Sequence, residues 1–362
     1  MRGSALDVAI DHSDRLAGVP ATPFLAADIG GTHGRVALMR ASRDGAGGAG
    51  GVEMLAYRVY PCAQFLTLSE LLQAFVEAHV PVPVKHCVLA CAGQVLGDEV
   101  VNDNLAWPIR LTQLRQALGF DQVAFLNDFE ALAYALDGSL TDDGHHLCGP
   151  ETSSSGPTLV IGPGTGLGAA VHVPSPTGGF VLGTEAGQMD FAPNSLRERE
   201  ILAHLAPGGG YVPFEYVVSG PGLLTIYTTL CALDGTTPTL ATPEAVTAAA
   251  VAHGDVRAVE ALDVFCACLG SLAGNLAMAF MPTGGVYLAG GFLSSIFEWL
   301  KRSSFEERFL HGRSARALLS HVPVWVTEHG RHGVHGAARW YLRHGMSGIG
   351  TPWPAVADGA AA

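Results

Sequence analysis

The stretch FLAADIGGTHGRVALMR, residues 24–40, consists of two apolar runs separated by a small polar hinge. The runs predict two buried strands joined by a turn that brings together Asp28, Gly30, Gly31 and Thr32. Glycines let several backbone N–H groups converge on one anion, because no side chain blocks the approach. Asp28 would then hold Mg²⁺, directly or through water, since hard cations prefer carboxylate and water oxygens. Taken alone, the stretch is better explained as a plain hairpin.

A second stretch, TLVIGPGTGLGAAVHV, repeats this layout with the turn Gly164-Thr165-Gly166. Gly164, Gly166 and Ala169 match the spacing of a dinucleotide-binding fingerprint, but such a fingerprint opens a helix and this run continues as a strand. A plain hairpin again explains the single turn better. The pair of turns favours two glycine bends that wrap one polyphosphate, with Thr32 and Thr165 adding hydroxyl donors.

The stretch VAFLNDFEALAYAL places an aspartate where a strand gives way to a helix. Apolar residues between 129 and 136 follow the spacing i, i+3, i+4, i+7, so a helix begins near Asn127. Ligands of open α/β sheets bind at the carboxyl ends of strands, which would suit Asp128 as a catalytic base. Asn127 and Glu130 also resemble a capping box, and a capping role explains Asp128 at least as well.

Further candidate contacts lie in three glycine-rich segments. GTEAGQMDFAP contains Glu185 and Gln188, and PFEYVVSGPG contains Glu215. These side chains suit hydrogen bonding to a polyhydroxylated ligand, although each one singly is better explained as a solvated loop residue. The run VYLAGGF ends in Gly290 and Gly291 before a helix, whose N-terminus attracts an anion or packs beside a nucleotide.

Composition excludes two classes of protein. The net charge of the 362 residues is −13 and no basic patch is evident, so nucleic acid is not an expected partner. The chain has two lysines, Lys85 and Lys301, and neither lies in a glycine loop. A P-loop nucleotide site is therefore excluded, because its motif requires a lysine.

The cysteines and the apolar segments point to the cytoplasm. The seven cysteines include no CxxC pair and are expected to be reduced, buried thiols. The first 20 residues carry acidic side chains and no long apolar region, unlike a secretory signal. The longest uncharged stretch, residues 264–280, is at the short limit for a membrane span and is interrupted by Asn275. We therefore expect a buried helix there, and no membrane contact.

Taken together, these motifs resemble the bacterial glucokinase family, within the actin-like, hexokinase-type ATPase superfamily. DIGGTHGR resembles the first phosphate motif of the family, LNDFEA its connecting segment with the catalytic aspartate, and IGPGTGLGAA its second phosphate motif. EAGQMDFAP, SGPGL and LAGG follow in the family's order and spacing. The resemblance runs from about Phe24 to about Leu342 and so covers nearly the whole chain.

The resemblance implies ATP- and Mg²⁺-dependent phosphorylation of the 6-hydroxyl of glucose, the first step of glycolysis, with Asp128 as the general base. The residues matched to sugar contacts of the family are Asn104, Asn127, Asp128, Glu185, Gln188 and Glu215. The residues matched to its ATP contacts are Asp28, Gly30, Gly31, Thr32, Gly164, Thr165, Gly166, Gly290 and Gly291. A related branch carries a cysteine-rich zinc cluster that this sequence lacks, so no zinc is expected.

The fold that the resemblance implies is an α/β, two-lobed actin-like ATPase (ribonuclease H-like) fold with a cleft between a small and a large domain. The expected small domain covers residues 22–126 and is completed by a C-terminal helix at 337–346. The large domain covers 127–336, and residues 1–21 and 347–362 are expected to be loose tails. Homodimers are usual in the family.

Two departures from the family pattern leave the sugar open. His33-Gly34 stands where Asn-Ala is common, and Gln188 stands where a histidine is common. Gln188 can still donate and accept a hydrogen bond, but it could change which sugar fits around its 2-position. The alternatives are a kinase for another hexose, such as N-acetylglucosamine or mannose, and a catalytically weak sugar sensor.

Overall fold

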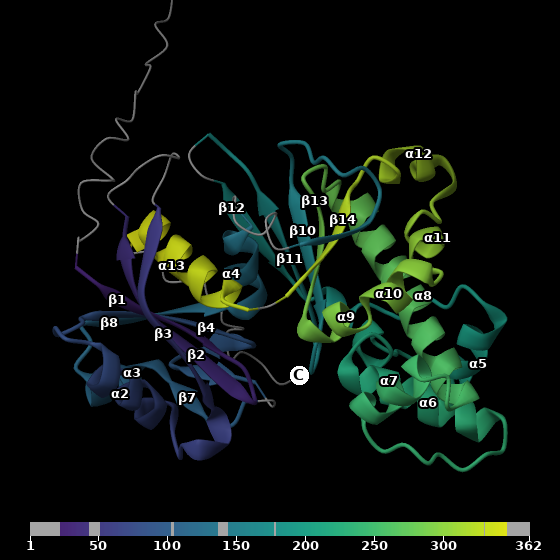
Figure 1. Ribbon diagram of the computed structural model, residues 1–362, viewed down its shortest axis with the longest axis horizontal. Coiled ribbons are helices and arrows are strands. Elements are labelled where there is room, and N and C mark those ends of the chain that lie inside the picture. The colour runs from purple at the N-terminus through teal and green to yellow at the C-terminus, as the bar shows by residue number, and fades with distance from the viewer. Residues whose placement is uncertain are drawn as a thin grey trace, which may run out of the picture.

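Two sheets form the centres of two lobes (Figure 1). The structure is a computed structural model that describes residues 22–42, 51–102, 105–136, 144–176, 179–328 and 330–345. In the first lobe a five-stranded sheet has the order β3-β2-β1-β4-β8. Its strands are β1 (Phe24–Ile29), β2 (His33–Ala41), β3 (Val52–Pro61), β4 (His86–Cys91) and β8 (Gln122–Asn127). A separate three-stranded sheet contains β5 (Gln94–Leu96), β6 (Glu99–Val101) and β7 (Ile109–Arg110).

Helices cover both faces of the five-stranded sheet. They are α2 (Leu68–His79), α3 (Leu111–Leu118) and, from the end of the chain, α13 (His332–His344). Successive residues of a strand point to opposite faces. Leu25 and Ala27 accordingly pack with α2 and α3, whereas Phe24 and Ala26 pack with α13. By the same alternation, Asp28 lies on the α13 face.

The register of the first sheet brings two candidate segments to one edge. β1 runs parallel to β4, and β4 runs parallel to β8. Ile29 is paired with Cys91, and Cys91 is paired with Asn127. The first glycine turn and the Asn127-Asp128 junction therefore lie at the same edge of the sheet, with β4 between them.

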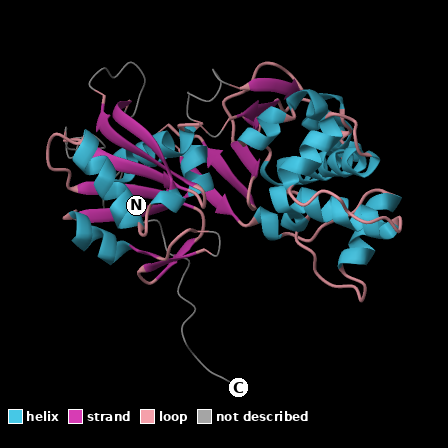
Figure 2. Cartoon of the chain, turned by 60° about the horizontal axis from the view of Figure 1, so that its bottom comes forward, coloured by secondary structure: helices cyan, strands magenta, loops and turns pink. Residues whose placement is uncertain are grey.

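The second lobe holds a six-stranded sheet in the order β12-β11-β10-β13-β14-β9. Its strands are β9 (His145–Cys148), β10 (Thr158–Pro163), β11 (Leu167–Val173), β12 (Phe180–Thr184), β13 (Gly285–Ala289) and β14 (Val324–Thr327). Its helices are α5 (Leu196–Leu205), α6 (Gly220–Leu233), α7 (Pro243–Val251), α8 (Val256–Phe280), α9 (Gly291–Ser295), α10 (Phe297–Arg302), α11 (Phe305–Phe309) and α12 (Arg316–Leu319). Figure 2 shows most of these helices gathered at the end of the molecule away from the first sheet.

Two helices, α4 (Asp128–Ala135) and α13, lie where the lobes meet (Figure 1). The side chain of Tyr134 belongs to the apolar cluster of the first sheet, whereas Leu132 packs against the second sheet. α4 and α13 approach so closely that a Cβ at Gly336 would overlap the carbonyl oxygen of Ala131. The final helix, which we expected at 337–346, begins earlier, at His332, and Gly333 in its first turn packs against Asp28 of β1.

The long apolar helix α8 forms the core of the second lobe. It is the one helix of the described chain that could cross a membrane by length and composition. However, 78% of its most apolar window is buried inside the lobe. The expectation of a buried helix at this stretch is confirmed.

All seven cysteines are buried and unpaired, three in the first lobe and four in the second. Burial raises the pKa of the Cys87 and Cys266 thiols to about 12. The expectation that these thiols are buried is confirmed. In the described part of the chain, no group of three or more His, Cys, Asp or Glu side chains is placed to hold a metal ion.

Candidate active site

Asp128 is the first residue of α4 and follows directly after β8. Asn127 caps the helix, because its Oδ1 accepts hydrogen bonds from the backbone N–H groups of Phe129 (2.9 Å) and Glu130 (3.3 Å). The Oδ1 of Asp128 also accepts from the N–H of Phe129, at 3.0 Å. Capping is thus mainly the role of Asn127, which leaves the second carboxylate oxygen of Asp128 available for a ligand.

The pKa of Asp128 is raised from 3.8 to about 7. Burial is the main cause, and the negative charge of Asp28 adds to it. The two aspartates come from the ends of strands that are two places apart in the sheet, which is about 9.6 Å. A carboxyl group with a pKa near neutrality can accept a proton during a reaction and release it afterwards.

Asp28 lies in a crowded, nearly closed position at the end of β1. The residue is 3% exposed, and its Oδ2 lies 3.6 Å from the guanidinium of Arg35 on β2. On the other side α13 begins, and a Cβ at Gly333 would lie 2.5 Å from the same oxygen. The start of the last helix therefore fixes this carboxylate in place.

The first glycine turn is held by its backbone and is open to solvent. The N–H of Gly30 donates to the carbonyl of His33 at 3.0 Å, and the carbonyl of Thr32 accepts from the N–H of Cys62 at 2.8 Å. Gly31 and Thr32 are exposed. Such a turn can present N–H groups and the Thr32 hydroxyl to an anion.

The second glycine turn joins β10 to β11 and has the same character. The N–H of Gly164 donates to the carbonyl of Gly166 at 2.8 Å, and Gly164 and Thr165 are exposed. The strands on either side of the turn touch the helix that carries Asp128, because the ring of Phe129 packs against both Gly162 and Gly168. The candidate base and the second turn are therefore neighbours.

The loop residues suggested as sugar contacts lie on two segments that pair with each other. Glu185 precedes the short helix η2 (Ala186–Gln188) and is exposed, as is Gln188. The hydroxyl of Tyr211 donates to the carbonyl of Gln188 and lies 3.4 Å from its Oε1. Glu215, in the short helix η3 (Phe214–Tyr216), reaches the second turn through a hydrogen bond described below.

Of the remaining candidates, the structure describes the two glycines after β13 but not Asn104. Gly290 and Gly291 follow β13, which is the parallel neighbour of β10, so they lie at the same edge as the second turn. Gly290 has a φ of 139°, which side chains rarely adopt, and a Cβ there would lie 3.5 Å from the carbonyl of Pro163. Asn104 falls outside the described residues.

Three further residues of this region were not singled out from the sequence. Arg35 pairs with Asp28, Gly333 leaves room for that carboxylate, and Tyr211 holds Gln188. Arg35 stands at the end of the DIGGTHGR motif, so its closeness to the turn could have been inferred from hairpin pairing. Nothing in the local sequence marks the other two.

The protein thus has a two-lobed α/β fold, with two glycine turns on separate sheets and a carboxylate at a strand–helix junction where the lobes meet. The model of the family described as Glucokinase matches residues 25–344. The chain belongs to the glucokinase family of sugar kinases. A glucokinase-like protein of Xylella fastidiosa is 43% identical over 320 residues, which cover 88% of this chain and 94% of the relative. A glucokinase of Brucella suis is 36% identical over 307 residues, which cover 84% and 86%.

Solved structures share the two-lobed fold. The crystal structure of a glucokinase from an Antarctic psychrotroph superimposes with a TM-score of 0.75 at 30% identity, covering 88% of this chain and 98% of that one. A glucokinase of the ROK family from Streptomyces griseus, solved with glucose and AMPPNP, gives a TM-score of 0.57 at 20% identity, covering 88% and 99%. The two-lobed α/β fold expected from the sequence is confirmed.

Proposed function

We propose that this chain transfers the γ-phosphoryl group of ATP to the 6-hydroxyl of D-glucose. The observation that carries the proposal is the position of Asp128, whose pKa is raised to about 7 at the strand–helix junction beside the second glycine turn. Membership of the glucokinase family, whose members use ATP, supports the same reaction.

Asp128 would orient the 6-hydroxyl and accept its proton as the oxygen attacks the phosphorus. The N–H groups of the two turns, Gly30 to Thr32 and Gly164 to Gly166, would donate to phosphate oxygens. Phosphoryl transfer needs alignment and charge stabilisation more than covalent help, and these donors supply both. Gly290 and Gly291 would pack beside the adenosine.

The residues at the first turn fit a magnesium ion. Mg²⁺ is usually held by one or two carboxylates together with substrate phosphates, and Asp28 supplies one such carboxylate beside the turn. Arg35 already lies 3.6 Å from Oδ2, so a contact through water suits this side chain better than direct coordination. When bound, the ion would neutralise charge that develops on the phosphates.

Asn127, Glu185, Gln188 and Glu215, together with Asn104, would hold the sugar hydroxyls. A second candidate substrate is another hexose, such as N-acetylglucosamine or mannose. Gln188 favours it, because a side-chain amide presents two N–H donors and a carbonyl oxygen in a different geometry, whereas the neutral imidazole of the histidine common in the family presents one N–H donor and one acceptor nitrogen. Tyr211 limits the rotation of this amide.

A coupled assay with MgATP and a panel of sugars tests the proposal. Rapid formation of glucose 6-phosphate supports glucokinase activity. A much higher kcat/KM for N-acetylglucosamine or mannose would transfer the proposal to that sugar. Sugar binding without turnover would instead indicate a sensor and would overturn the assignment of Asp128 as an effective base.

A further inference from the structure

We propose that Glu215 couples the two substrate sites, so that a bound sugar strengthens nucleotide binding through this one side chain. The inference rests on the proposed function and deepens it. It concerns how the acceptor sugar and the second phosphate turn influence each other.

Glu215 is bonded directly to the second turn. Its Oε2 accepts a hydrogen bond from the backbone N–H of Leu167, at 2.8 Å, immediately after the turn. The contact is close, since a Cβ at Gly166 would lie 2.7 Å from the same oxygen. A carboxylate that accepts a backbone N–H forms a strong, charge-assisted hydrogen bond. Any shift of this side chain therefore acts on the end of the turn.

The same segment also holds the start of the turn. The N–H of Gly220 donates to the carbonyl of Gly164 at 2.8 Å. Ser219 ties this contact to Glu215, because its hydroxyl donates to the carbonyl of Glu215 at 2.7 Å and accepts from the N–H of Gly222 at 2.9 Å. Residues 215–220 are thus hydrogen-bonded to both ends of the turn.

On its other side, the Glu215 segment is joined to the loop that carries Gln188. The N–H of Phe214 donates to the carbonyl of Met189 at 2.9 Å. The N–H of Phe191 donates to the carbonyl of Val212 at 2.7 Å. The proposed sugar contacts and the phosphate turn are therefore parts of one hydrogen-bonded unit, with Glu215 at the junction.

The two carboxylate oxygens of Glu215 can serve the two substrates separately. Oε2 is bonded to Leu167, and Oε1 is left for a sugar hydroxyl. A sugar bound to Oε1 would restrict the side chain and with it the geometry of the Gly164–Gly166 turn. By thermodynamic reciprocity, nucleotide binding must then strengthen sugar binding by the same factor.

Calorimetric titration of the full chain tests the coupling. The dissociation constant of the non-hydrolysable analogue AMPPNP with Mg²⁺ is measured without and with saturating glucose, and the ratio is the coupling factor. The variants are Glu215→Ala, which removes the link, and Glu215→Gln, which keeps its shape. Gln188→Leu is the matched control, because its side chain is bonded to Tyr211 and not to the turn. Circular dichroism checks that each variant is folded.

We expect a wild-type coupling factor of at least about fivefold. In Glu215→Ala the coupling factor should fall below about two, so that the two ligands bind almost independently. In Glu215→Gln the coupling factor should be at least about threefold lower than in the wild type, because a neutral amide oxygen is a weaker hydrogen-bond acceptor than a carboxylate. Gln188→Leu should weaken glucose binding and keep the wild-type factor once glucose is saturating.

The role of Glu215 would be overturned if both Glu215 variants kept the wild-type coupling factor. It would also be overturned if Gln188→Leu lowered the coupling factor as much as the Glu215 variants do. Independent binding of the two ligands by the wild type would also overturn it, while leaving the proposed reaction intact. If the wild type bound neither glucose nor AMPPNP, the proposed function itself would be wrong, and this inference would fall with it.

Discussion

The ring of Phe129 lies against the backbone of Gly168, so closely that a Cβ at this glycine would overlap the ring. Phe129 is the neighbour of Asp128 on α4, and Gly168 belongs to β11, just after the second glycine turn. This contact sets the distance between the candidate base and the turn. A displacement of about 1 Å at such a place is enough to slow a reaction about a hundredfold.

Replacing Gly168 with alanine should therefore lower kcat strongly. The added methyl group must push Phe129 away, which should also cost about 1–3 kcal/mol of stability. Steady-state kinetics and urea unfolding measure the two effects. Gly208→Ala is the control, because a Cβ there meets no atom within 4 Å. A Gly168→Ala enzyme with the kinetics of the control would show that this packing does not position Asp128.

Replacing Asp128 with asparagine should lower kcat by about 10²–10⁴-fold, the usual contribution of a general base. The shape and the capping of α4 are kept, so sugar affinity measured by calorimetry should change little. Asp121→Asn serves as the control, since Asp121 precedes β8 at its opposite end and pairs with Lys85 on the surface. Near-normal turnover of the Asp128 variant would remove this residue from the catalytic role.

The pH dependence of activity and of stability should follow the same carboxyl group. The base form is needed, so kcat/KM should rise about tenfold per unit up to pH ~7 and level off above it. Because the folded-state pKa is raised, the stabilising effect of this group is full at acidic pH and is lost as pH rises through about 7. The melting temperature of Asp128→Asn should therefore exceed that of wild type by an amount that grows between about pH 4 and pH 7. A constant difference across this range would contradict the raised pKa.

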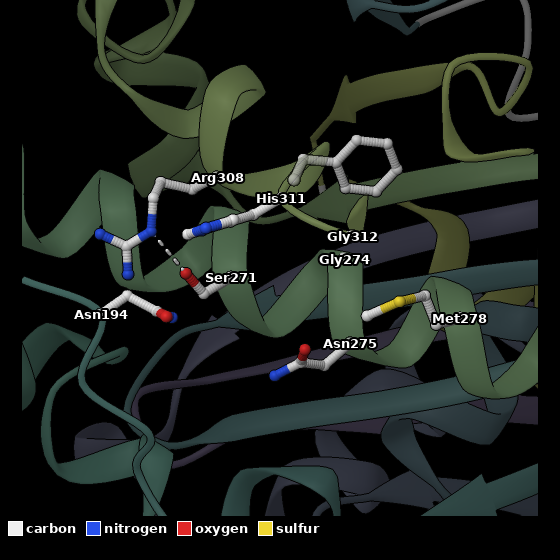
Figure 3. Close-up of a pocket in the computed structure, with 9 residues that line it drawn as sticks. Asn194, Ser271, Gly274, Asn275, Met278, Arg308, His311 and Gly312 are labelled. Carbon is white, nitrogen blue, oxygen red and sulfur yellow. Dashed lines mark hydrogen bonds between the residues drawn. The ribbon is translucent and has the colours of Figure 1, made fainter. Parts of the chain in front are cut away.

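A buried ion pair in the second lobe offers a test of stability away from the site. Arg308 donates to both carboxylate oxygens of Glu198, at 2.6 and 3.0 Å, and to the hydroxyl of Ser271. Arg308 and Ser271 line a pocket of about 140 Å³ that Asn194 also lines. Figure 3 shows the hydrogen bond between Arg308 and Ser271 in its wall. The side chain of Glu198 is 2% exposed, so removing its partner leaves a buried charge unpaired.

Arg308→Met should therefore lower the free energy of unfolding by about 3–5 kcal/mol. Arg40→Met is the matched control, because the pair of Arg40 and Glu53 is exposed and should contribute less than about 1 kcal/mol. Urea unfolding followed by circular dichroism gives both values. If both variants lost the same free energy of unfolding, burial would not make the pair of Arg308 and Glu198 more important for stability than the exposed pair.

The sequence was most informative for features that depend on residues close together along the chain. The two strand–glycine–strand stretches and the helix that begins beside Asn127 follow from periodicity and turn chemistry, and the structure has them where they were expected. Each of these signals involves residues within one turn of a helix or one hairpin. The assignment of catalytic and binding roles to the residues they carry stays a prediction.

Contacts between distant segments could not be predicted in this way. Glu215 and Leu167 are 48 residues apart, and Arg308 and Glu198 are 110 apart. Such pairs depend on how helices and sheets pack, and a single sequence carries no periodic signal for them. The early start of α13 was missed for the same reason, because Gly333 packs against Asp28 of the first sheet, which is far away in the sequence.

The buried cysteines can serve as natural probes of local unfolding in each lobe. A thiol-specific alkylating reagent reacts with the thiolate, so buried groups of raised pKa should be modified only when their surroundings unfold. Cys62 and Cys87 report on the first lobe, and Cys266 and Cys268 report on the second. Mass spectrometry of fragments labelled for increasing times would therefore reveal which half of the molecule loosens first, without adding any foreign probe.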